Sequence, residues 1–177
     1  MCNCSPHIAL LHLVAIGFGC LLIAELARRS LRPAVFWAIV GTMSALMFVF
    51  LYQISYPDEP FFDFVKAYWP AGEAALKSPS SVITLFEEGA ESFVNIPVLA
   101  YLFAPFALAP PIAAAWVLTA LGVVAMLAAW RVLSDLAGLD RMQSALLMFV
   151  GSAFGPLVYS TAEGNTSHIL ILALALG

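Results

Sequence analysis

Long runs of uncharged apolar residues constrain this chain more than any other feature. Residues 33–54 contain no charged side chain, and residues 8–26 contain only Glu25. About 20 apolar residues in a helix cross the roughly 30 Å hydrocarbon core of a bilayer, so each run is long enough to span a membrane. The chain is 63% hydrophobic and 10% charged, whereas a soluble domain carries about 25% charged residues. The bilayer is therefore the solvent for most of this chain.

These runs predict an all-α polytopic membrane protein with a single transmembrane domain over residues 1–177. The expected spans are 8–26, 33–54, a short one at 94–109, 111–132, 142–160 and an incomplete one at 167–177. The last run reaches Gly177 without a polar flank. We therefore expect the chain to be the N-terminal part of a longer protein.

The basic residues predict which side of the membrane each loop faces. Arg28, Arg29 and Arg32 lie in the short loop between the first two runs, and loops rich in Lys and Arg stay in the cytoplasm. The N-terminus and the loop 56–92 are then outside. We expect a multi-pass protein of the cytoplasmic (inner) membrane.

The orientation of the later segments depends on the short run 94–109. If this run spans the membrane, residues 163–168 are cytoplasmic. If it is re-entrant or lies along the interface, Arg131 and Arg141 are cytoplasmic and residues 163–168 are outside. The two arginines favour the second arrangement, but Asp135 and Asp140 share their loop, so both alternatives stay open here.

The outer loop 56–92 is amphipathic. It holds seven acidic residues, two lysines and a dense group of aromatic side chains. At 100° per residue, Asp63, Lys66, Glu73 and Lys77 fall within an arc of about 80° on a helix. The pattern predicts an interfacial amphipathic helix, kinked at Pro70, with an i,i+4 ion pair between Glu73 and Lys77.

The carboxylate of Asp63 has two interpretations from this pattern. An acidic residue near a helix N-terminus commonly interacts with the helix dipole, and interfacial aromatic residues commonly anchor a helix. Alternatively, the helix holds the carboxylate at the membrane surface, where a lipid headgroup would bind. The pattern alone favours the first interpretation.

Three segments resemble glycosyltransferase family 87, a family of membrane enzymes in the GT-C superfamily. DFVKAYWPAGEAAL resembles the D-F-x-x-Y-x-x-A-x-x-x-L segment of that family's first outer loop. NIPVLAYLFAPFALAPPIAAAWVLTALG is similar to its P-x-L-x-x-L-F-A-P-x-A-L-x-P block and next span. GPLVYSTAEGNTSHILILALALG is similar to a later stretch, although Glu163-Gly164-Asn165 replaces a more usual Gly-Gln pair. The three segments follow the family's order over residues 60–177.

The resemblance implies a GT-C-like, partial transmembrane helical bundle with an inverting transferase activity. Mannose or arabinose would move from a polyprenyl-phosphate donor to the hydroxyl of a lipid or glycan acceptor outside the cytoplasmic membrane. Asp63 is the implied catalytic base, with Asp58 as runner-up. Lys66 and Tyr68 are the candidate substrate-binding residues of the same loop.

Further polar residues beside apolar spans are also candidates, because such residues are costly in a membrane and commonly functional. Glu163, Asn165 and His168 form this group. We expect no cofactor and no protein metal site, while dependence on a divalent metal stays open. No basic patch or motif indicates nucleic acid as a partner. The alternative function is a non-catalytic membrane scaffold or a fragment of a transporter.

Overall fold

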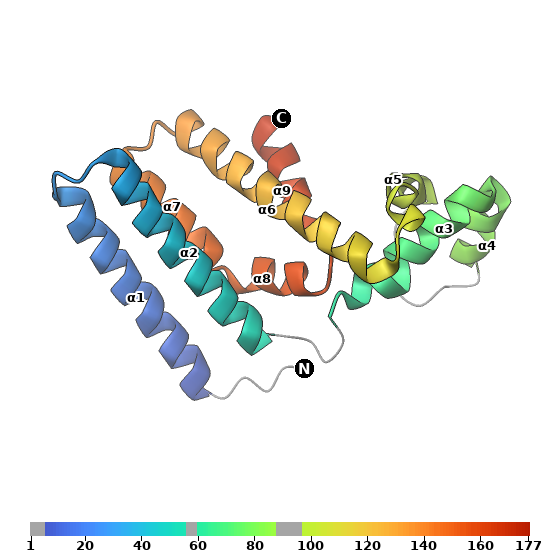
Figure 1. Cartoon of the computed structure of the whole chain (residues 1–177), viewed down its shortest axis with the longest axis horizontal. Coiled ribbons are helices and arrows are strands. Elements are labelled where there is room, and N and C mark those ends of the chain that lie inside the picture. The colour runs from blue at the N-terminus through green and yellow to red at the C-terminus, as the bar shows by residue number, and fades with distance from the viewer. Residues whose placement is uncertain (1–5, 56–59, 88–96) are drawn as a thin grey trace. The chain divides into compact units, whose positions relative to one another are not determined.

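The computed structural model describes residues 6–55, 60–87 and 97–177, and all regular elements in these ranges are helical (Figure 1). They are α1 (Pro6–Arg28), α2 (Pro33–Ser55), the π-helix η1 (Phe64–Tyr68), α3 (Trp69–Lys77), α4 (Pro79–Glu87), the 3₁₀-helix η2 (Pro97–Leu99), α5 (Ala100–Phe103), the 3₁₀-helix η3 (Phe106–Leu108), α6 (Pro111–Leu136), α7 (Arg141–Ser152), α8 (Gly155–Ala162) and α9 (Ser167–Leu176).

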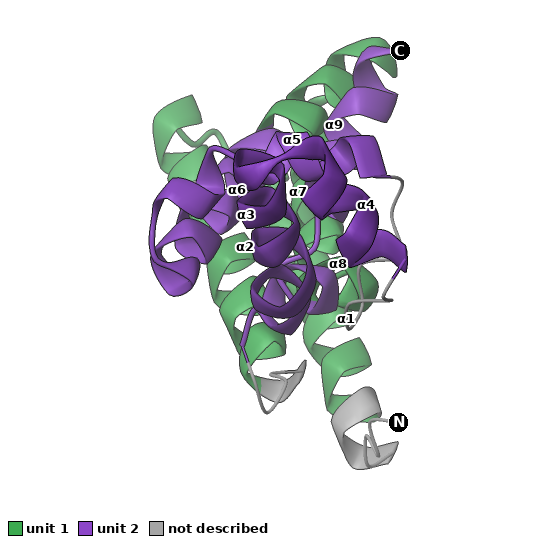
Figure 2. Cartoon of the chain, turned by 90° about the vertical axis from the view of Figure 1, so that its right-hand side faces the viewer, with its two compact units in different colours: residues 1–54, 128–158 green, residues 55–127, 159–177 purple. Residues whose placement is uncertain are grey.

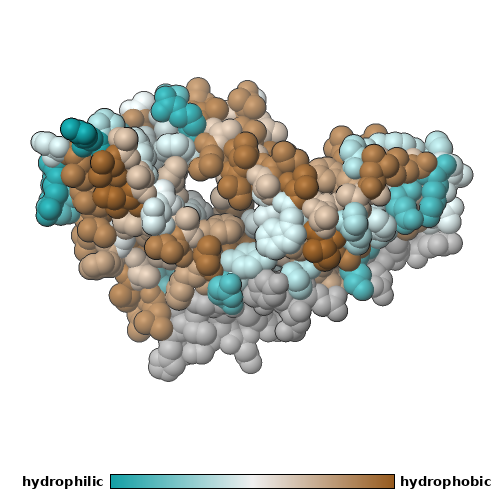
Figure 3. All heavy atoms as spheres, viewed as in Figure 1, coloured by the Kyte–Doolittle hydropathy of each residue, from teal (hydrophilic) through white to brown (hydrophobic). Residues whose placement is uncertain are grey.

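Among these elements, three helices are long and apolar enough to cross a membrane. They comprise Leu10–Arg28 of α1, Pro33–Gln53 of α2 and the whole of α6. Only 11%, 28% and 33% of their most apolar stretches are buried within the protein. Because burying one large apolar side chain is worth about 1.5–3 kcal/mol, such exposed surfaces are stable only in lipid. Apolar residues also cover much of the face shown in Figure 3. The prediction of an all-α membrane protein is confirmed.

Two expected spans are interrupted where proline occurs. The range 142–160 forms α7 and α8, which are bent by 50° at a short break. Pro156 lies just inside the start of α8, where its missing N–H group is tolerated. In the range 94–109, the described residues form η2, α5 and η3 rather than one long helix, and Pro105 separates the last two.

The chain divides into two compact units, which are coloured separately in Figure 2. Unit 1 comprises Met1–Ile54 and Ala128–Val158. In this unit α7 packs against α1, and Gly19 provides room on α1 for the ring of Phe149. Trp130 donates a hydrogen bond of 2.8 Å to the carbonyl of Ser144. The buried core of unit 1 consists of Ile23, Phe36, Val40, Met47, Leu51, Ala145, Phe149, Ala153 and Val158.

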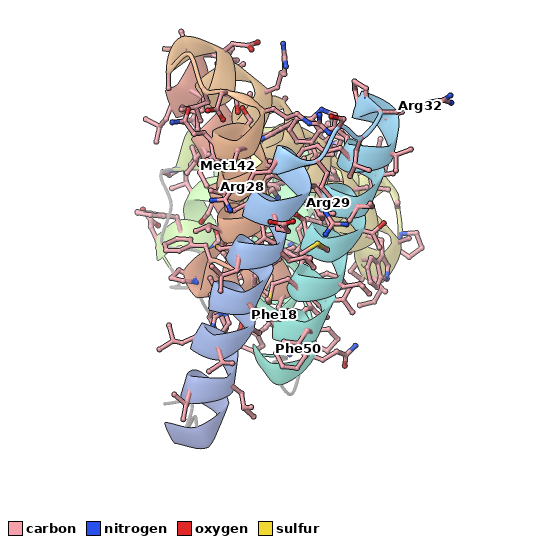
Figure 4. The ribbon with its side chains drawn as sticks, turned by 90° about the vertical axis from the view of Figure 1, so that its left-hand side faces the viewer. Phe18, Arg28, Arg29, Arg32, Phe50 and Met142 are labelled. Carbon is pink, nitrogen blue, oxygen red and sulfur yellow. The ribbon has the colours of Figure 1, made fainter. Side chains whose placement is uncertain are left out.

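Arginine side chains gather at the α1–α2 turn of unit 1. Figure 4 shows Arg28, Arg29 and Arg32 at this turn, whereas Phe18 and Phe50 lie further along the two helices. Arg141, at the start of α7, reaches the same turn, because its Nη1 donates to the Leu31 carbonyl at 3.4 Å. The guanidinium of Arg141 also lies 3.8 Å from the ring centroid of Phe36. Four arginines therefore lie at this end of unit 1, two of them in ion pairs with Glu25.

Unit 2 comprises Ser55–Leu127 and Tyr159–Gly177. In this unit α3 packs against α4 and α5. The stacked rings of Tyr68 and Phe103, 4.6 Å apart, lie within its core. The predicted ion pair of the amphipathic helix is confirmed, because Lys77 Nζ lies 3.2 Å from Glu73 Oε1. The buried core consists of Phe61, Phe64, Ala67, Tyr68, Ala71, Ala74, Val82, Ala100, Phe103, Ala114, Ala115 and Leu118.

Gly72 allows α3 to approach the backbone of α5. A Cβ atom at Gly72 would lie 2.5 Å from the carbonyl oxygen of Phe103. Because backbone cannot rotate away, we expect Gly72→Ala to destabilise the protein by about 1–3 kcal/mol through overpacking. Thermal unfolding in detergent measures this loss. Gly41→Ala is the matched control, since Gly41 in α2 has no atom within 4 Å of the added Cβ. Equal melting temperatures for the two variants would contradict the prediction.

Candidate carboxylate site

The turn after α8 depends on a glycine in the left-handed conformation. Gly164 has a φ of 74°, which glycine adopts without the steric penalty of a Cβ atom. Its N–H donates to the Thr161 carbonyl at 3.1 Å, and the N–H of Asn165 donates to the Ser160 carbonyl at 2.8 Å. This pair of hydrogen bonds is the Schellman arrangement that ends many helices. The sequence Glu163-Gly164-Asn165 therefore ends α8 and places Asn165 just after it.

The start of the amphipathic helix binds to this turn through its backbone. The N–H of Phe61 donates to the Ala162 carbonyl at 2.8 Å, and the N–H of Phe64 donates to the Glu163 carbonyl at 3.2 Å. The first N–H groups and the last carbonyl groups of helices lack partners within their own helix. Here the N–H groups at the start of one helix donate to the carbonyl groups at the end of the other.

A polar cluster connects the same two segments. Asn165 Nδ2 donates to Asp63 Oδ2 at 3.2 Å. Asn165 Oδ1 accepts hydrogen bonds from the N–H of Thr166 at 2.7 Å and from the Tyr68 hydroxyl at 3.4 Å. Asp63 and Asn165 are both partly buried. The structure thus brings together three residues that the sequence suggested separately, namely Asp63, Tyr68 and Asn165.

The backbone two residues before Asp63 is strained. Phe61 has a φ of 60°, a conformation that is rare and unfavourable for a bulky residue. Its side chain is 2% exposed, and its ring packs edge-to-face on Trp116 with centroids 5.0 Å apart. Strained residues persist only where surrounding contacts hold them, and they cluster at functional sites. The ring contact and the Phe61–Ala162 hydrogen bond provide that support.

The helix widens after Asp63 into the π-helical stretch η1. The N–H of Trp69 donates to the Phe64 carbonyl, five residues earlier. Pro70 has no N–H, and a proline ring clashes with the carbonyl four residues before it in a regular α-helix. The π-helical stretch accommodates Pro70, where the sequence suggested a kink. Lys66 lies on η1 with its side chain exposed, and π-helical turns are frequent at functional sites.

Two further candidate residues, Glu163 and His168, have almost completely buried side chains. They belong to unit 2 and are 8% and 1% exposed. The His168 ring lies against Gly122. Neither of its nitrogens forms a hydrogen bond of good geometry among the described residues, although the backbone of Leu118 lies beside the ring. The runner-up Asp58 lies outside the described residues.

The fold and this site define an integral membrane protein with a partly buried carboxylate beside an exposed lysine. A carboxylate fixed by a neutral donor is suited to accept a proton from a hydroxyl group. Within the described ranges, no three His, Cys, Asp or Glu residues are grouped so as to hold a metal ion.

Residues 93–177 match the family model described as Glycosyltransferase family 87. The match confirms the family resemblance and assigns this part of the chain to glycosyltransferase family 87. The matched range lies in the C-terminal rather than the N-terminal part of the chain. The resemblance expected for residues 60–92 therefore falls outside the matched range. Asp63 precedes the matched range and Asn165 lies within it. Comparison with curated proteins and solved structures found no significant match.

The family implies a membrane glycosyltransferase, which acts on a sugar donor and an acceptor. Sequence reasoning did not anticipate the strained Phe61 or its contact with Trp116. Gly164 and Asn165 do form a recognisable helix-stop signal. That signal predicts the turn but not its partner, because the Asp63–Asn165 hydrogen bond joins residues 102 positions apart.

Proposed function

We propose that the protein transfers mannose or arabinose from a polyprenyl-phosphate donor to an acceptor hydroxyl on the outer face of the cytoplasmic membrane. Asp63 is the general base. The observation that carries this proposal is the Asp63–Asn165 hydrogen bond of 3.2 Å. It connects the candidate base directly to a residue of the family-matched region.

The proposed reaction inverts the anomeric carbon in one displacement. The Asp63 carboxylate takes the proton of the acceptor hydroxyl, and the hydroxyl oxygen forms a bond to the anomeric carbon. The bond between that carbon and the phosphate oxygen breaks, and polyprenyl phosphate leaves from the opposite face. Lys66, exposed on η1 one helical turn from Asp63, is the candidate cation for the donor phosphate. Glu163 and His168 are buried, so the proposal assigns them no contact with substrate.

Two observations support an outer location for the site. The hydrogen bond between Asp63 and Asn165 requires residues 163–168 to be on the same side of the membrane as the loop 56–92. Arg141 contacts the α1–α2 turn, so the α6–α7 loop shares a side with Arg28, Arg29 and Arg32, which the positive-inside rule assigns to the cytoplasm. Both observations favour the arrangement in which residues 94–109 do not span the membrane.

Sealed vesicles of known orientation test the reaction and its side together. The probes are radiolabelled mannose or arabinose on a short-chain polyprenyl phosphate, with hydrophilic glycans that cannot cross the membrane as acceptors. Right-side-out vesicles that contain the protein should form labelled product, whereas inside-out vesicles and protein-free vesicles should not. Product from inside-out vesicles alone would refute the outer location. No product with either donor, in vesicles or detergent, would favour the scaffold or transporter alternative.

A further inference from the structure

The side-chain amide of Asn165 has one orientation that satisfies its neighbours. The backbone N–H of Thr166 can only donate, so the amide atom 2.7 Å from it must be the oxygen Oδ1. The amino group of Asn165 then points toward Asp63, and it donates to Oδ2 at 3.2 Å. The Tyr68 hydroxyl completes the arrangement by donating to Oδ1. Thr166 and Tyr68 therefore fix the direction of the donor that Asp63 receives.

The two oxygens of Asp63 consequently differ. Oδ2 accepts the hydrogen bond from Asn165, whereas Oδ1 accepts none from the residues that the structure describes. A carboxylate held at one oxygen loses much of its rotational freedom. The other oxygen remains able to accept a proton from a defined direction, which is the condition for efficient proton transfer.

We propose that Asn165 is a positioning residue that holds Oδ2 of Asp63, so that Oδ1 takes the proton of the acceptor hydroxyl. This inference rests on the proposed function, because it assumes that Asp63 is the base. Asn165 itself stays neutral and touches no reacting atom. Its position in the Gly164 turn explains how a residue 102 positions away can set the geometry of the outer helix.

Asn165→Ser removes the contact to Asp63 without adding a charge, because a serine side chain is too short to reach Oδ2. We expect kcat to fall about 10–100-fold, the size of effect that a small misplacement of a reacting group produces. The KM for the polyprenyl-phosphate donor should stay within about twofold, since the donor phosphate does not contact Asn165 in the proposed arrangement. Steady-state kinetics with purified protein in detergent measures both constants.

Ser160→Ala is the matched control in the same turn. The Ser160 hydroxyl has no hydrogen-bond partner among the described residues, and its backbone carbonyl still accepts from Asn165. This variant should keep the wild-type kcat and melting temperature. A fall in kcat for Asn165→Ser that is matched by Ser160→Ala would refute the inference.

The exchange variant Asp63→Asn/Asn165→Asp tests whether the pair only connects the two segments or whether the carboxylate must be at position 63. The amide now at position 63 can donate to the carboxylate at position 165, so the link between the segments is restored. We expect a melting temperature near wild type and no sugar transfer. Transfer restored together with stability would show that the pair is only structural and would overturn the inference.

The outcomes also distinguish the inference from the proposed function. If Asp63→Asn alone keeps wild-type transfer, the assignment of the base fails. If Asp63→Asn is inactive while Asn165→Ser keeps wild-type kcat, the base stands and the positioning role fails. If Asn165→Ser does not fold, Asn165→Asp tests the same point, because its carboxylate still accepts from Thr166 and Tyr68 but cannot donate to Asp63. A wild-type kcat in that variant would refute the positioning role.

Discussion

Asp63→Asn is expected to lower the rate of sugar transfer by about 10²–10⁴-fold, the contribution typical of a general base. The substitution keeps the size of the side chain, and its oxygen can still accept a hydrogen bond from Asn165. It removes the negative charge that binds the proton of the acceptor hydroxyl. Initial rates with saturating radiolabelled donor measure the loss, and the melting temperature shows whether the fold is preserved.

Glu73→Gln is the matched control for this experiment. Glu73 is a carboxylate on the same amphipathic helix, and its ion pair with Lys77 is partly exposed to solvent. Such surface pairs contribute about 0–1 kcal/mol to stability, so this variant should transfer sugar at the wild-type rate. Transfer by Asp63→Asn within about threefold of wild type, at equal expression, would remove Asp63 from the role of base.

Gly164→Ala is expected to have the largest effect on stability. At a φ of 74°, the left-handed conformation costs an alanine about 1–2 kcal/mol. The new Cβ would also lie 2.7 Å from the Cβ of Phe64. Overpacking of this kind costs roughly a further 1–3 kcal/mol. Because this turn carries Asn165, we also expect sugar transfer to fall. Thermal unfolding in detergent and transfer assays at low temperature measure the two effects.

Gly138→Ala measures the cost of the left-handed backbone conformation without a steric clash. Gly138 also has a positive φ, 61°, but an added Cβ there would meet no atom within 4 Å. The free energy of unfolding of this variant should fall only by the roughly 1–2 kcal/mol that the left-handed conformation costs an alanine. The variant should keep its transfer activity. If the two variants lose equal stability, the close approach of the added Cβ at position 164 to Phe64 does not contribute to the destabilisation.

The sequence predicted the elements that depend on local pattern. The uncharged apolar runs indicate α1, α2 and α6 because the length needed to cross a bilayer is fixed. The helical spacing of Glu73 and Lys77 predicts their ion pair, and the structure has it. In each case residues close in the chain determine the feature, so periodicity and length are sufficient.

The assembly of the candidate site could not be predicted in this way. Hydropathy says nothing about which loop contacts which turn, so Asp63 and Asn165 were separate candidates, and their catalytic roles stay predictions. The strained backbone of Phe61 depends on a hydrogen bond to Ala162 and a ring contact with Trp116. Neither partner is near it in the sequence.

The backbone hydrogen bonds between the two helix ends affect how the protein is made. The segment at Phe61–Phe64 leaves the ribosome long before Ala162 and Glu163, which accept its N–H groups. At about 5–20 residues per second, the 102 positions between Asp63 and Asn165 correspond to about 5–20 s of synthesis. During that interval the segment that carries Asp63 has been synthesised, but the turn that carries Asn165 has not. The carboxylate site can therefore form only after the turn at Gly164 has been synthesised.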